Sequence, residues 1–564
     1  MREEHPNPQF KRDNFTSLNG TWQFMSEATG DKARPINVPF CPESRLSGIG
    51  FTGFINECAY VRTFETALPA AGERVVLNFG AVDHDAEVYV NGNFAGAHSG
   101  GYTPFGFDIA PLLKEGENEL KVLVRDNTSA NYPSGKQSSR PETYGCFYTR
   151  VTGIWQSVWL ERTPSEYIKQ FRFFPDVRRV SVDIELSVEG EGEAEIEVFY
   201  DGREVGRVSG LVRYRRKFSV PLKEKRLWEP GAGRLYDVKI SFKGDTVTSY
   251  FGLREARYDG MRFLLNGKSV FQRFVLDQGY YPDGLYTAPD EKSLERDVRL
   301  GMSLGFNGAR LHQKLFEPLF LYHCDRLGYM VWGEYASWGV KYDDLEALGA
   351  FVSEWTEAVN RDFNHPCIVT WCPLNETWEN LDVPGKVRDV RFVNAVYALT
   401  KALDPTRPCV DVSGGFHGAE TDLYDFHDYL DPETVRGHIK AIEDGDELVM
   451  DRIYAPDFAG ETDLKYKPGI PLNASEYGGM AFSAESGGWG YSTSRSEEEF
   501  SENYIALTDL WLDCPKISGF CYTQLYDVEQ EQNGLLNYDR SEKFSKDITE
   551  KIARCNKRPA AMEK

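Results

Sequence analysis

The chain has 564 residues, which is too long for one hydrophobic core, so three or four domains are expected. Hydrophobic residues make up 41% of the chain and aromatic residues 13%, which suits packed cores and argues against disorder. The formal net charge of -23 argues against nucleic acid and anionic membranes as partners, because such an acidic surface repels both.

The ten cysteines and the N-terminal segment favour a cytoplasmic location. No two cysteines form a C-x-x-C pair, and many lie in apolar, strand-like segments. We therefore expect buried free thiols in a reducing compartment, without a disulfide framework or a zinc site. The first 15 residues lack the apolar core of a signal peptide, although an earlier removal of such a segment stays open. No apolar run reaches the 18 residues that a membrane-spanning helix needs.

Residues 1–165 predict a β-sandwich. Short apolar or alternating segments recur between turn residues, and few helical periods are visible. The segments are RVVLNFGAV (74–82), AEVYVNG (86–92), ELKVLVRDN (119–127) and QSVWLER (156–162). The pair Asn91-Gly92 predicts a β-hairpin turn.

Residues 166–258 predict a second β-sandwich of the immunoglobulin-like type. The segments VSVDIELSVEG (180–190) and EAEIEVFYDG (193–202) alternate cleanly between apolar and polar residues, and Asp201-Gly202 predicts a turn. The segment YDVKISFKGD (236–245) adds further strand. About 90 residues with several short strands are typical of this sandwich.

From residue 259 to 564, strand-like segments alternate with helix-like ones. The eight candidate strands are SVFQRFVL (269–276), NGARLH (307–312), YMVWGE (329–334), IVTWCPLNE (368–376), CVDVSG (409–414), LYDFHDY (423–429), PLNASE (471–476) and GFCYTQL (519–525). Amphipathic helices are expected at 291–305, with Asp290 as N-cap, around 351–363, at 385–403 and near 545–555. This pattern predicts a (β/α)8 barrel. A doubly wound open sheet is the alternative.

Two glutamates stand at the ends of predicted strands. Glu376 follows the fourth strand and Glu476 closes the seventh, so both are expected at the C-terminal rim, where barrels carry their chemistry. A pair of carboxylates flanking one bond is what glycoside hydrolysis requires, with one group protonated and the other ionised. For a single glutamate after a strand, an ordinary loop acid is the more frequent case; the second glutamate favours catalysis. Asn375 lies beside Glu376 and is a candidate to bind the hydroxyl next to the reacting carbon.

Metal ligation is the competing use of these acids. The chain has no H-E-x-x-H or His-x-His spacing, so we expect no required metal or other cofactor, while bound Mg²⁺ or Na⁺ as a helper stays open. His312 and His427 fit two interpretations equally well, substrate contacts or structural groups bonded behind the site. Glu334 also fits a structural acid bonded to a neighbouring strand.

Several longer motifs span all three regions: LNGTWQF (18–24), GGYTPFGFDI (100–109), VTGIWQSVWLE (151–161), LWEP (227–230), GFNGARLHQK (305–314), NHPCIVTWCPLNETW (364–378), ASEYGG (474–479) and YTQLYDVEQEQNGLLNYDR (522–540). These motifs resemble those of glycoside hydrolase family 2, whose members include β-galactosidases, β-glucuronidases and β-mannosidases. The first domain resembles the family's jelly-roll sugar-binding domain and the second its immunoglobulin-like sandwich. The resemblance implies a jelly roll, an immunoglobulin-like sandwich and a TIM barrel.

The family's pattern implies a retaining, exo-acting β-glycosidase with a carbohydrate substrate. Glu376 would be the general acid/base and Glu476 the nucleophile. Arg310 would orient or ionise Glu476. The remaining candidate sugar contacts are His312, Asn375, His427, Gln524 and, more weakly, Asp277. Members are often homo-oligomers, so a homo-oligomer is one option.

The sequence departs from the family where the sugar is recognised. After the first barrel strand the chain reads RFVLDQGYYPDG (273–284), unlike better-known members, and its Asn-Gly-Lys at 266–268 is expected in a hairpin turn, away from the site where glucuronidases use such a motif. We therefore place β-galactosidase ahead of β-glucuronidase, with β-mannosidase and arabinosidase as further specificities. A carbohydrate-binding protein without catalysis, built on the same scaffold, is the alternative from another class.

Overall fold

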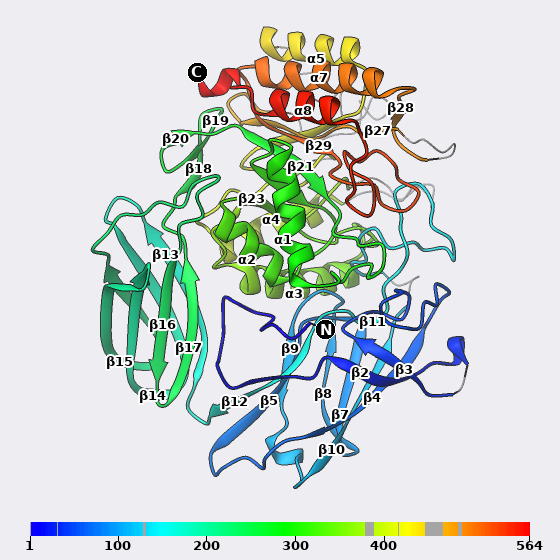
Figure 1. Ribbon diagram of the computed structural model, residues 1–564. Helices are drawn as coiled ribbons and strands as arrows, with labels where there is room; N and C mark the ends of the chain where they lie inside the picture. The colour runs from blue at the N-terminus through cyan, green and yellow to red at the C-terminus, as the bar shows by residue number, and fades with distance from the viewer. Residues whose placement is uncertain are drawn as a thin grey trace.

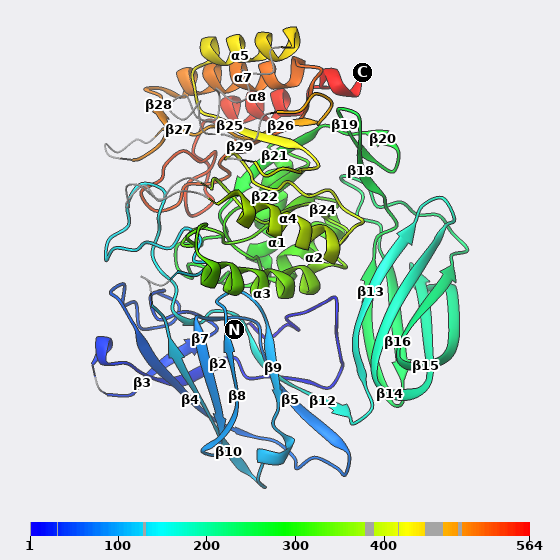
Figure 2. The same cartoon turned by 180° about the vertical axis from the view of Figure 1, so that it is seen from behind.

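The computed structural model describes the chain except for residues 1, 31, 128–130, 378–388, 416, 446–465 and 483–487. Three regions follow one another along the chain, and the last of them, a barrel, lies between and above the two β-regions in the view of Figure 1. Figure 2 shows the same arrangement from behind. Among the described helices, none combines the length and apolar character needed to span a membrane.

The first region is a sandwich of two antiparallel sheets, as expected. One sheet has the order β3 (Arg34–Val38), β2 (Gly20–Met25), β4 (Glu57–Glu65), β10 (Glu117–Arg125), β7 (Asp85–Val90) and β8 (Asn93–Ser99); the other has the order β1 (Phe15–Ser17), β12 (Val158–Pro164), β5 (Glu73–Phe79) and β9 (Phe105–Asp108). The short strands β6 (Val82–Asp83) and β11 (Gly153–Ile154) form a separate pair. Alternate side chains of both sheets, such as Phe24, Leu77 and Val122, fill one core. Asn91 and Gly92 both have positive φ in the turn between β7 and β8, which confirms the predicted hairpin.

The second region is a five-stranded antiparallel sheet folded around its own core. Its strands are β13 (Ile168–Asp176), β14 (Ser181–Tyr200), β15 (Arg203–Pro221), β16 (Tyr236–Phe242) and β17 (Asp245–Phe251). The long strand β14 pairs with β13 through its first half and with β16 through its second half, and its pairing with β15 is interrupted between Ser187 and Glu191. The strand can bend at such an irregularity, so one long hairpin serves both halves of the sandwich. Asp201 and Gly202 form the turn before β15, as predicted.

A small three-stranded sheet connects this region to the barrel. It consists of β18 (Ala256–Asp259), β19 (Arg262–Leu265) and β20 (Lys268–Ser269). Asn266 and Gly267 both have positive φ between β19 and β20, so Asn-Gly-Lys 266–268 lies in a hairpin turn, as expected. Asn266 donates to the carbonyl of Trp228, and Lys268 pairs with Glu229. These contacts explain the motif without a ligand.

Seven parallel strands form the barrel wall. Their order is β24 (Ile368–Cys372), β23 (Met330–Glu334), β22 (Gly308–Leu311), β21 (Gln272–Asp277), β29 (Ile517–Thr523), β26 (Leu472–Gly478) and β25 (Tyr424–Asp428). The residues of these strands are almost all buried, because helices or the barrel interior cover both faces.

The predicted strand at 409–414 is present in position but not as a regular strand. Cys409 and Ser413 form isolated parallel bridges with Trp371 and Asn375, beside β24. On its other side, Ser413 Oγ donates to Asp425 of β25 at 2.9 Å. The segment therefore occupies the gap between β24 and β25, which agrees with a barrel and not with an open sheet.

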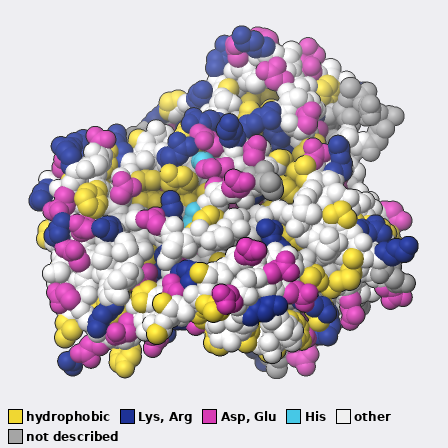
Figure 3. Space-filling view, turned by 60° about the horizontal axis from the view of Figure 1, so that its bottom comes forward, with side chains coloured by type: hydrophobic (Ala, Val, Ile, Leu, Met, Phe, Trp, Pro, Cys, Tyr) yellow, Lys and Arg dark blue, Asp and Glu magenta, His cyan; other side chains and the backbone are white. Residues whose placement is uncertain are grey.

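Helices cover the outside of the barrel. They are α1 (Glu291–Ser303), α2 (Pro318–Leu327), α3 (Leu345–Asp362), α4 (Val390–Leu403), α5 (Pro432–Asp444), α7 (Glu497–Asp513) and α8 (Lys546–Asn556). The Asp290 side chain accepts from the Ser293 amide at the start of α1, so the predicted N-cap is confirmed. Part of the predicted helix 385–403, including Val387, lies outside the described residues. Basic and acidic side chains are interspersed on the face drawn in Figure 3, so the charge there is not gathered in one patch.

Candidate active site

Glu376 lies on an unusual turn just after β24. Its φ is 38°, in the left-handed region that non-glycine residues rarely adopt. Its amide donates to the carbonyl of Ser413 at 2.8 Å, and the neighbouring Asn375 bridges the same residue. The segment 409–413, which completes the barrel wall, therefore also holds the turn that carries this carboxylate.

Glu476 reaches the same space from β26. One carboxylate oxygen of Glu376, one of Glu476 and a ring nitrogen of His427 all lie within 4.8 Å of one another. His427 Nδ1 is 2.6 Å from Glu376 Oε1 and 3.4 Å from Glu476 Oε2. Two glutamates far apart in sequence thus form a close pair at the barrel rim, with an imidazole between them.

Arg310 of β22 connects the groups behind this pair. The side chain is fully buried; Nη1 donates to Glu476 Oε1 at 2.7 Å, while Nε and Nη2 donate to Glu334 and to Asn375 Oδ1. His312 lies beside it, with Nδ1 2.9 Å from Glu334 Oε1 and Nε2 4.0 Å from Glu476 Oε1. Glu334 therefore acts as a structural acceptor for the neighbouring strand.

The surrounding charges keep Glu476 ionised. Burial alone would raise the pKa of its carboxyl, but His427, Arg310, His312 and Lys136 lower that pKa to about 2. Burial lowers the pKa of His427, whereas Glu476 and Glu376 raise it, and the net result is a pKa above the ordinary value. Burial and the charge of Arg310 bring the pKa of His312 well below its usual range.

Tyr429 is a further contact of Glu476, from the residue directly after β25. Its hydroxyl donates to Glu476 Oε2 and lies 3.2 Å from Thr523 Oγ1. Its ring stacks on Tyr491, with 3.5 Å between the ring centroids and 6° between the planes. The sequence placed Tyr429 at a strand end, but nothing in the pattern assigned it a role.

Gln524 and Asp277 lie among protein partners. Gln524 accepts from Gln278 and donates to Asn533, both at 2.8 Å. Asp277 accepts from the Tyr526 hydroxyl and from the Gly279 amide, and burial together with Asp297 raises the pKa of its carboxyl to about 6. As sugar contacts the two residues stay predictions.

Lys136 enters the site from the first region and was not found from the sequence. The residue is 4% exposed, and Nζ lies 4.6 Å from the centroid of the Trp338 ring. Burial lowers its pKa, but Cys146, Glu531, Glu476 and Glu376 raise it, and the pKa ends above the ordinary value. Trp338 in turn donates to the carbonyl of Asn375 at 3.1 Å. No local motif marks this lysine, because it precedes the barrel by more than a hundred residues.

Two groups of ligand-type side chains are close enough to hold a metal within the described residues. One is the Glu376, His427, Glu476 cluster itself. The other is Asp325, His365 and Cys367, in which Asp325 accepts from His365 Nδ1 at 2.6 Å and from the Cys367 amide at 2.8 Å. Hydrogen bonds within the protein therefore account for the second group.

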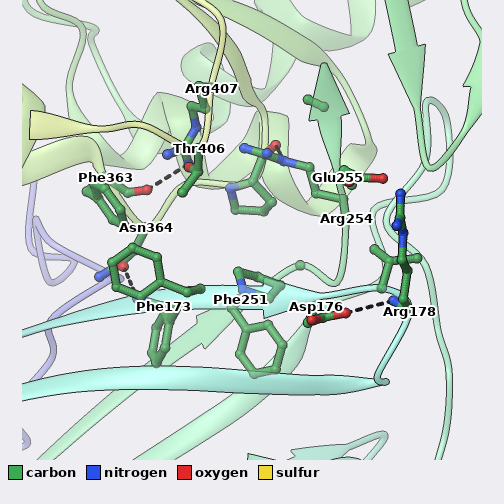
Figure 4. A pocket seen from close by; sticks show the side chains of 16 residues that line it. Phe173, Asp176, Arg178, Phe251, Arg254, Glu255, Phe363, Asn364, Thr406 and Arg407 are labelled. Atoms are coloured by element: carbon green, nitrogen blue, oxygen red, sulfur yellow. Dashed lines mark hydrogen bonds between the residues drawn. The ribbon is translucent and has the colours of Figure 1, made fainter. Parts of the chain in front are cut away.

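A cavity of about 460 Å³ lies elsewhere, between the second β-region and the barrel. Figure 4 shows the residues that line it, with Phe173 and Phe251 on one side and Arg254 and Arg407 on the other. Arg254 donates to the carbonyls of Pro366 and Ile368, and Arg407 to those of Ile368 and Phe363. The two arginines thus bind the backbone at the start of β24, and the cavity is separate from the carboxylate pair.

Two family models match the chain. Residues 52–164 match the sugar-binding domain of glycosyl hydrolases family 2, and residues 260–488 match the TIM barrel domain of the same family. Together the two matches cover more than half of the sequence, and the second includes both Glu376 and Glu476.

Individual relatives carry two different names. A putative β-glucuronidase of Formosa agariphila is 27% identical over 354 residues, or 59% of this chain and 41% of the relative. A β-galactosidase of Thermoanaerobacterium thermosulfurigenes is 27% identical over 388 residues, or 63% and 51%. The chain thus spans about half the length of these curated relatives. The solved β-glucuronidase of Bifidobacterium dentium, complexed with coumarin-3-O-glucuronide, shares the fold with a TM-score of 0.79 and 20% identity, over 97% of this chain and 98% of that one.

Proposed function

Because this chain belongs to glycoside hydrolase family 2, we propose that it is an exo-acting, retaining β-glycosidase that removes a terminal non-reducing sugar. The observation that carries this proposal is the pair of carboxylates at the barrel rim. Their oxygens approach within 4.8 Å, which suits retention, since inverting enzymes keep their carboxyl groups about 6.5–9.5 Å apart to admit a water.

Glu476 is the proposed nucleophile. With its pKa lowered to about 2, it is ionised at neutral pH and ready to attack the anomeric carbon. Glu376 is the proposed acid/base and donates a proton to the departing glycosidic oxygen as that bond breaks. A glycosyl ester on Glu476 results, and the aglycone leaves as an alcohol.

The second step reverses the roles. Glu376, now a carboxylate, removes a proton from water, whose oxygen attacks the anomeric carbon and releases Glu476. Two inversions at one carbon leave the β configuration unchanged. The His427 contacts to both carboxylates place a protonatable group where charge changes in each step.

Asn375 is the proposed contact for the hydroxyl beside the reacting carbon. Its Oδ1 accepts from Arg310, while its buried Nδ2 has no hydrogen-bond partner among the described residues. A buried donor without an acceptor is costly, and a substrate hydroxyl would satisfy it. The reaction as proposed needs no metal, which chelation by EDTA would test through unchanged turnover.

The observations support the type of reaction more strongly than the identity of the sugar. The resemblance puts a galactoside ahead of a glucuronide, and relatives of both names are equally similar. A binding protein without catalysis is disfavoured, because such a protein would have no need for a buried, ionised glutamate beside a second one.

A panel of 4-nitrophenyl β-glycosides (galactoside, glucuronide, galacturonide, mannoside, arabinoside) tests the proposal on the intact protein, Glu476→Ala and Glu376→Ala. We expect the intact protein to cleave at least one of these glycosides, and NMR should show the β anomer of the sugar as the first product. In Glu476→Ala, turnover should fall on the order of 10⁴-fold. Added azide should restore turnover in both variants, with an α-glycosyl azide as the product of Glu476→Ala and a β-glycosyl azide as the product of Glu376→Ala. Absence of cleavage across the panel would favour the binding protein, and normal turnover by Glu476→Ala would refute the nucleophile assignment.

A further inference from the structure

Backbone hydrogen bonds and a glycine fix the loop that holds Lys136 in the candidate site. Ser134 and Gly135 both donate their amides to the carbonyl of Trp338, at 2.8 and 3.2 Å, and the Lys136 carbonyl accepts from Tyr148 at 2.8 Å. Gly135 has a φ of 59°, and a Cβ there would approach the carbonyl oxygen of Gln313 to 2.2 Å. Only glycine fits this position, so the backbone next to the lysine is fixed against the barrel.

The other side of the loop is attached to the segment after β29. Gln530 Nε2 donates to the carbonyls of Gly145 and Phe147 at 2.8 and 2.9 Å, and the Thr149 amide donates to Glu529 at 3.0 Å. Figure 1 shows this cyan loop leaving the first region and lying beside the orange-red segment of the barrel. The position of Lys136 is thus set by contacts on both sides.

Within the described part of the chain, the lysine has no strong acceptor. Its ammonium lies over the face of Trp338 and beside the thiol of Cys146, and no described carboxylate oxygen lies within the 4.0 Å of an ion pair. Glu531 and the two glutamates of the site offset the cost of burying this charge from a distance, but none of them accepts its three N–H donors directly. Such a group is suited to an acceptor that arrives with the substrate.

The other cations of the site are already engaged. Arg310 is bonded to Glu334, Glu476 and Asn375, and His427 lies between the two catalytic candidates. An anionic substrate would meet the carboxylates of Glu376 and Glu476, and only an additional positive charge offsets that repulsion. Of the cations described around the pair, Lys136 is the one left for a ligand.

We infer that Lys136 is a specificity-determining residue that binds the carboxylate of a terminal hexuronic acid, so that the enzyme prefers β-uronides to neutral hexosides. This inference rests on the proposed function and reverses the ranking that the sequence favoured. It assigns recognition of the acid to the first β-region, since the Asn-Gly-Lys segment at 266–268 is a hairpin turn.

The test uses sugar pairs that differ only at C6. The rates kcat/KM are measured for 4-nitrophenyl β-glucuronide against β-glucoside and for β-galacturonide against β-galactoside, with the wild-type protein, Lys136→Met, Lys136→Arg and the exposed control Lys114→Met. Thermal melts confirm that each variant is folded. We expect a uronide to be preferred by the wild type, a loss of about 10- to 150-fold for that uronide in Lys136→Met, mainly in KM, and less than about 5-fold for its neutral partner. Lys136→Arg should recover part of the loss, and the control should match the wild type.

The outcomes separate the two proposals. Cleavage of neutral sugars with no preference for uronides overturns the role of Lys136 and leaves the glycosidase proposal standing, whereas no cleavage of any sugar overturns both. If Lys136→Met lowers acidic and neutral rates alike and moves the acid limb of both pH profiles, the lysine supports Glu476 instead of the substrate, and the inference is wrong.

Discussion

Replacing Arg310 by Met would test whether its charge keeps Glu476 ionised. The guanidinium donates to Glu476 Oε1 at 2.7 Å, which puts the two charge centres about 4 Å apart. At an effective dielectric constant of about 20, that separation corresponds to about 4 kcal/mol, or about 3 pH units in the titration of the carboxyl. The charges of His427 and Lys136 remain, so a movement of about 2–3 pH units is expected.

The readout is the acid limb of kcat/KM against pH. In the wild type the pKa of Glu476 is about 2, so activity persists to low pH as far as the fold allows. In Arg310→Met the limb should move upward into the range near pH 4–5. Arg310→Lys retains a charge while losing the fork of hydrogen bonds, so it should lower the rate but shift the limb by less than about 1 pH unit.

Stability should follow the same linkage. Removing Arg310 leaves buried Glu334 and Glu476 without their cation, at a cost of about 3–5 kcal/mol in unfolding free energy at neutral pH. Because the variant's Glu476 takes up a proton near pH 4–5 and the wild type's only near pH 2, the difference in melting temperature should shrink as the pH falls from about 6 toward 3. A folded Arg310→Met protein with an unchanged acid limb would refute the role of Arg310 in ionising Glu476.

Two further substitutions test a hydrogen bond within the site and an ion pair near the start of β24. Tyr429→Phe removes the hydroxyl that donates to Glu476 but keeps the ring on Tyr491, so kcat/KM should fall about 10- to 100-fold with little change in melting temperature; a rate within twofold of wild type contradicts this. Asp404→Asn breaks the buried pair with Arg407 and should lower unfolding free energy by about 3–5 kcal/mol at pH 7, measured by thermal or urea unfolding. Burial alone would raise the pKa of Asp404, but Arg407 lowers it to about 2. The ion pair therefore stabilises the fold above the ordinary pKa of an aspartate, near 3.8, and this stabilisation is lost as the pH falls toward 2. If Asp404→Asn is still less stable than the wild type at that low pH, the ion pair is not the cause.

The barrel could be predicted because its strands are buried on both faces. Segments such as 329–334 and 368–376 are mostly apolar, as strands of a parallel sheet covered on both faces are, and the polar residues at their ends identify the rim. The segment 409–414 shows the limit of this reasoning. Its apolar pattern is strand-like, but side-chain bonds such as that between Ser413 and Asp425 hold it where ladder hydrogen bonds were expected.

The carboxylate pair could be predicted from the sequence, but the charged groups around it could not. Glu376 follows a strand and Glu476 lies near the end of another, so a local pattern locates them. Lys136 acts on them from a loop of another region, and its position depends on Gly135 fitting against Gln313 and on contacts with Trp338. Such a placement follows from tertiary docking, which no periodicity encodes. Asp277 and Gln524 show the converse, since a strand-end position alone does not separate a substrate contact from a buried hydrogen-bond partner.

Because the proposed uronide substrate and the protein are both negatively charged, kcat/KM for the uronide should depend on ionic strength. The chain carries a formal charge of -23, so a uronide approaches against long-range repulsion that salt screens beyond about 10 Å at 0.1 M. Contact with buried Lys136 is screened much less, because little water or salt reaches it. Raising the ionic strength from about 10 to 200 mM should therefore increase kcat/KM for the uronide by roughly twofold or more, while the matched neutral glycoside changes little. If salt instead lowers the uronide rate and spares the neutral one, attraction outweighs repulsion along the path of entry, and the positive charge that governs capture extends well beyond a single buried lysine.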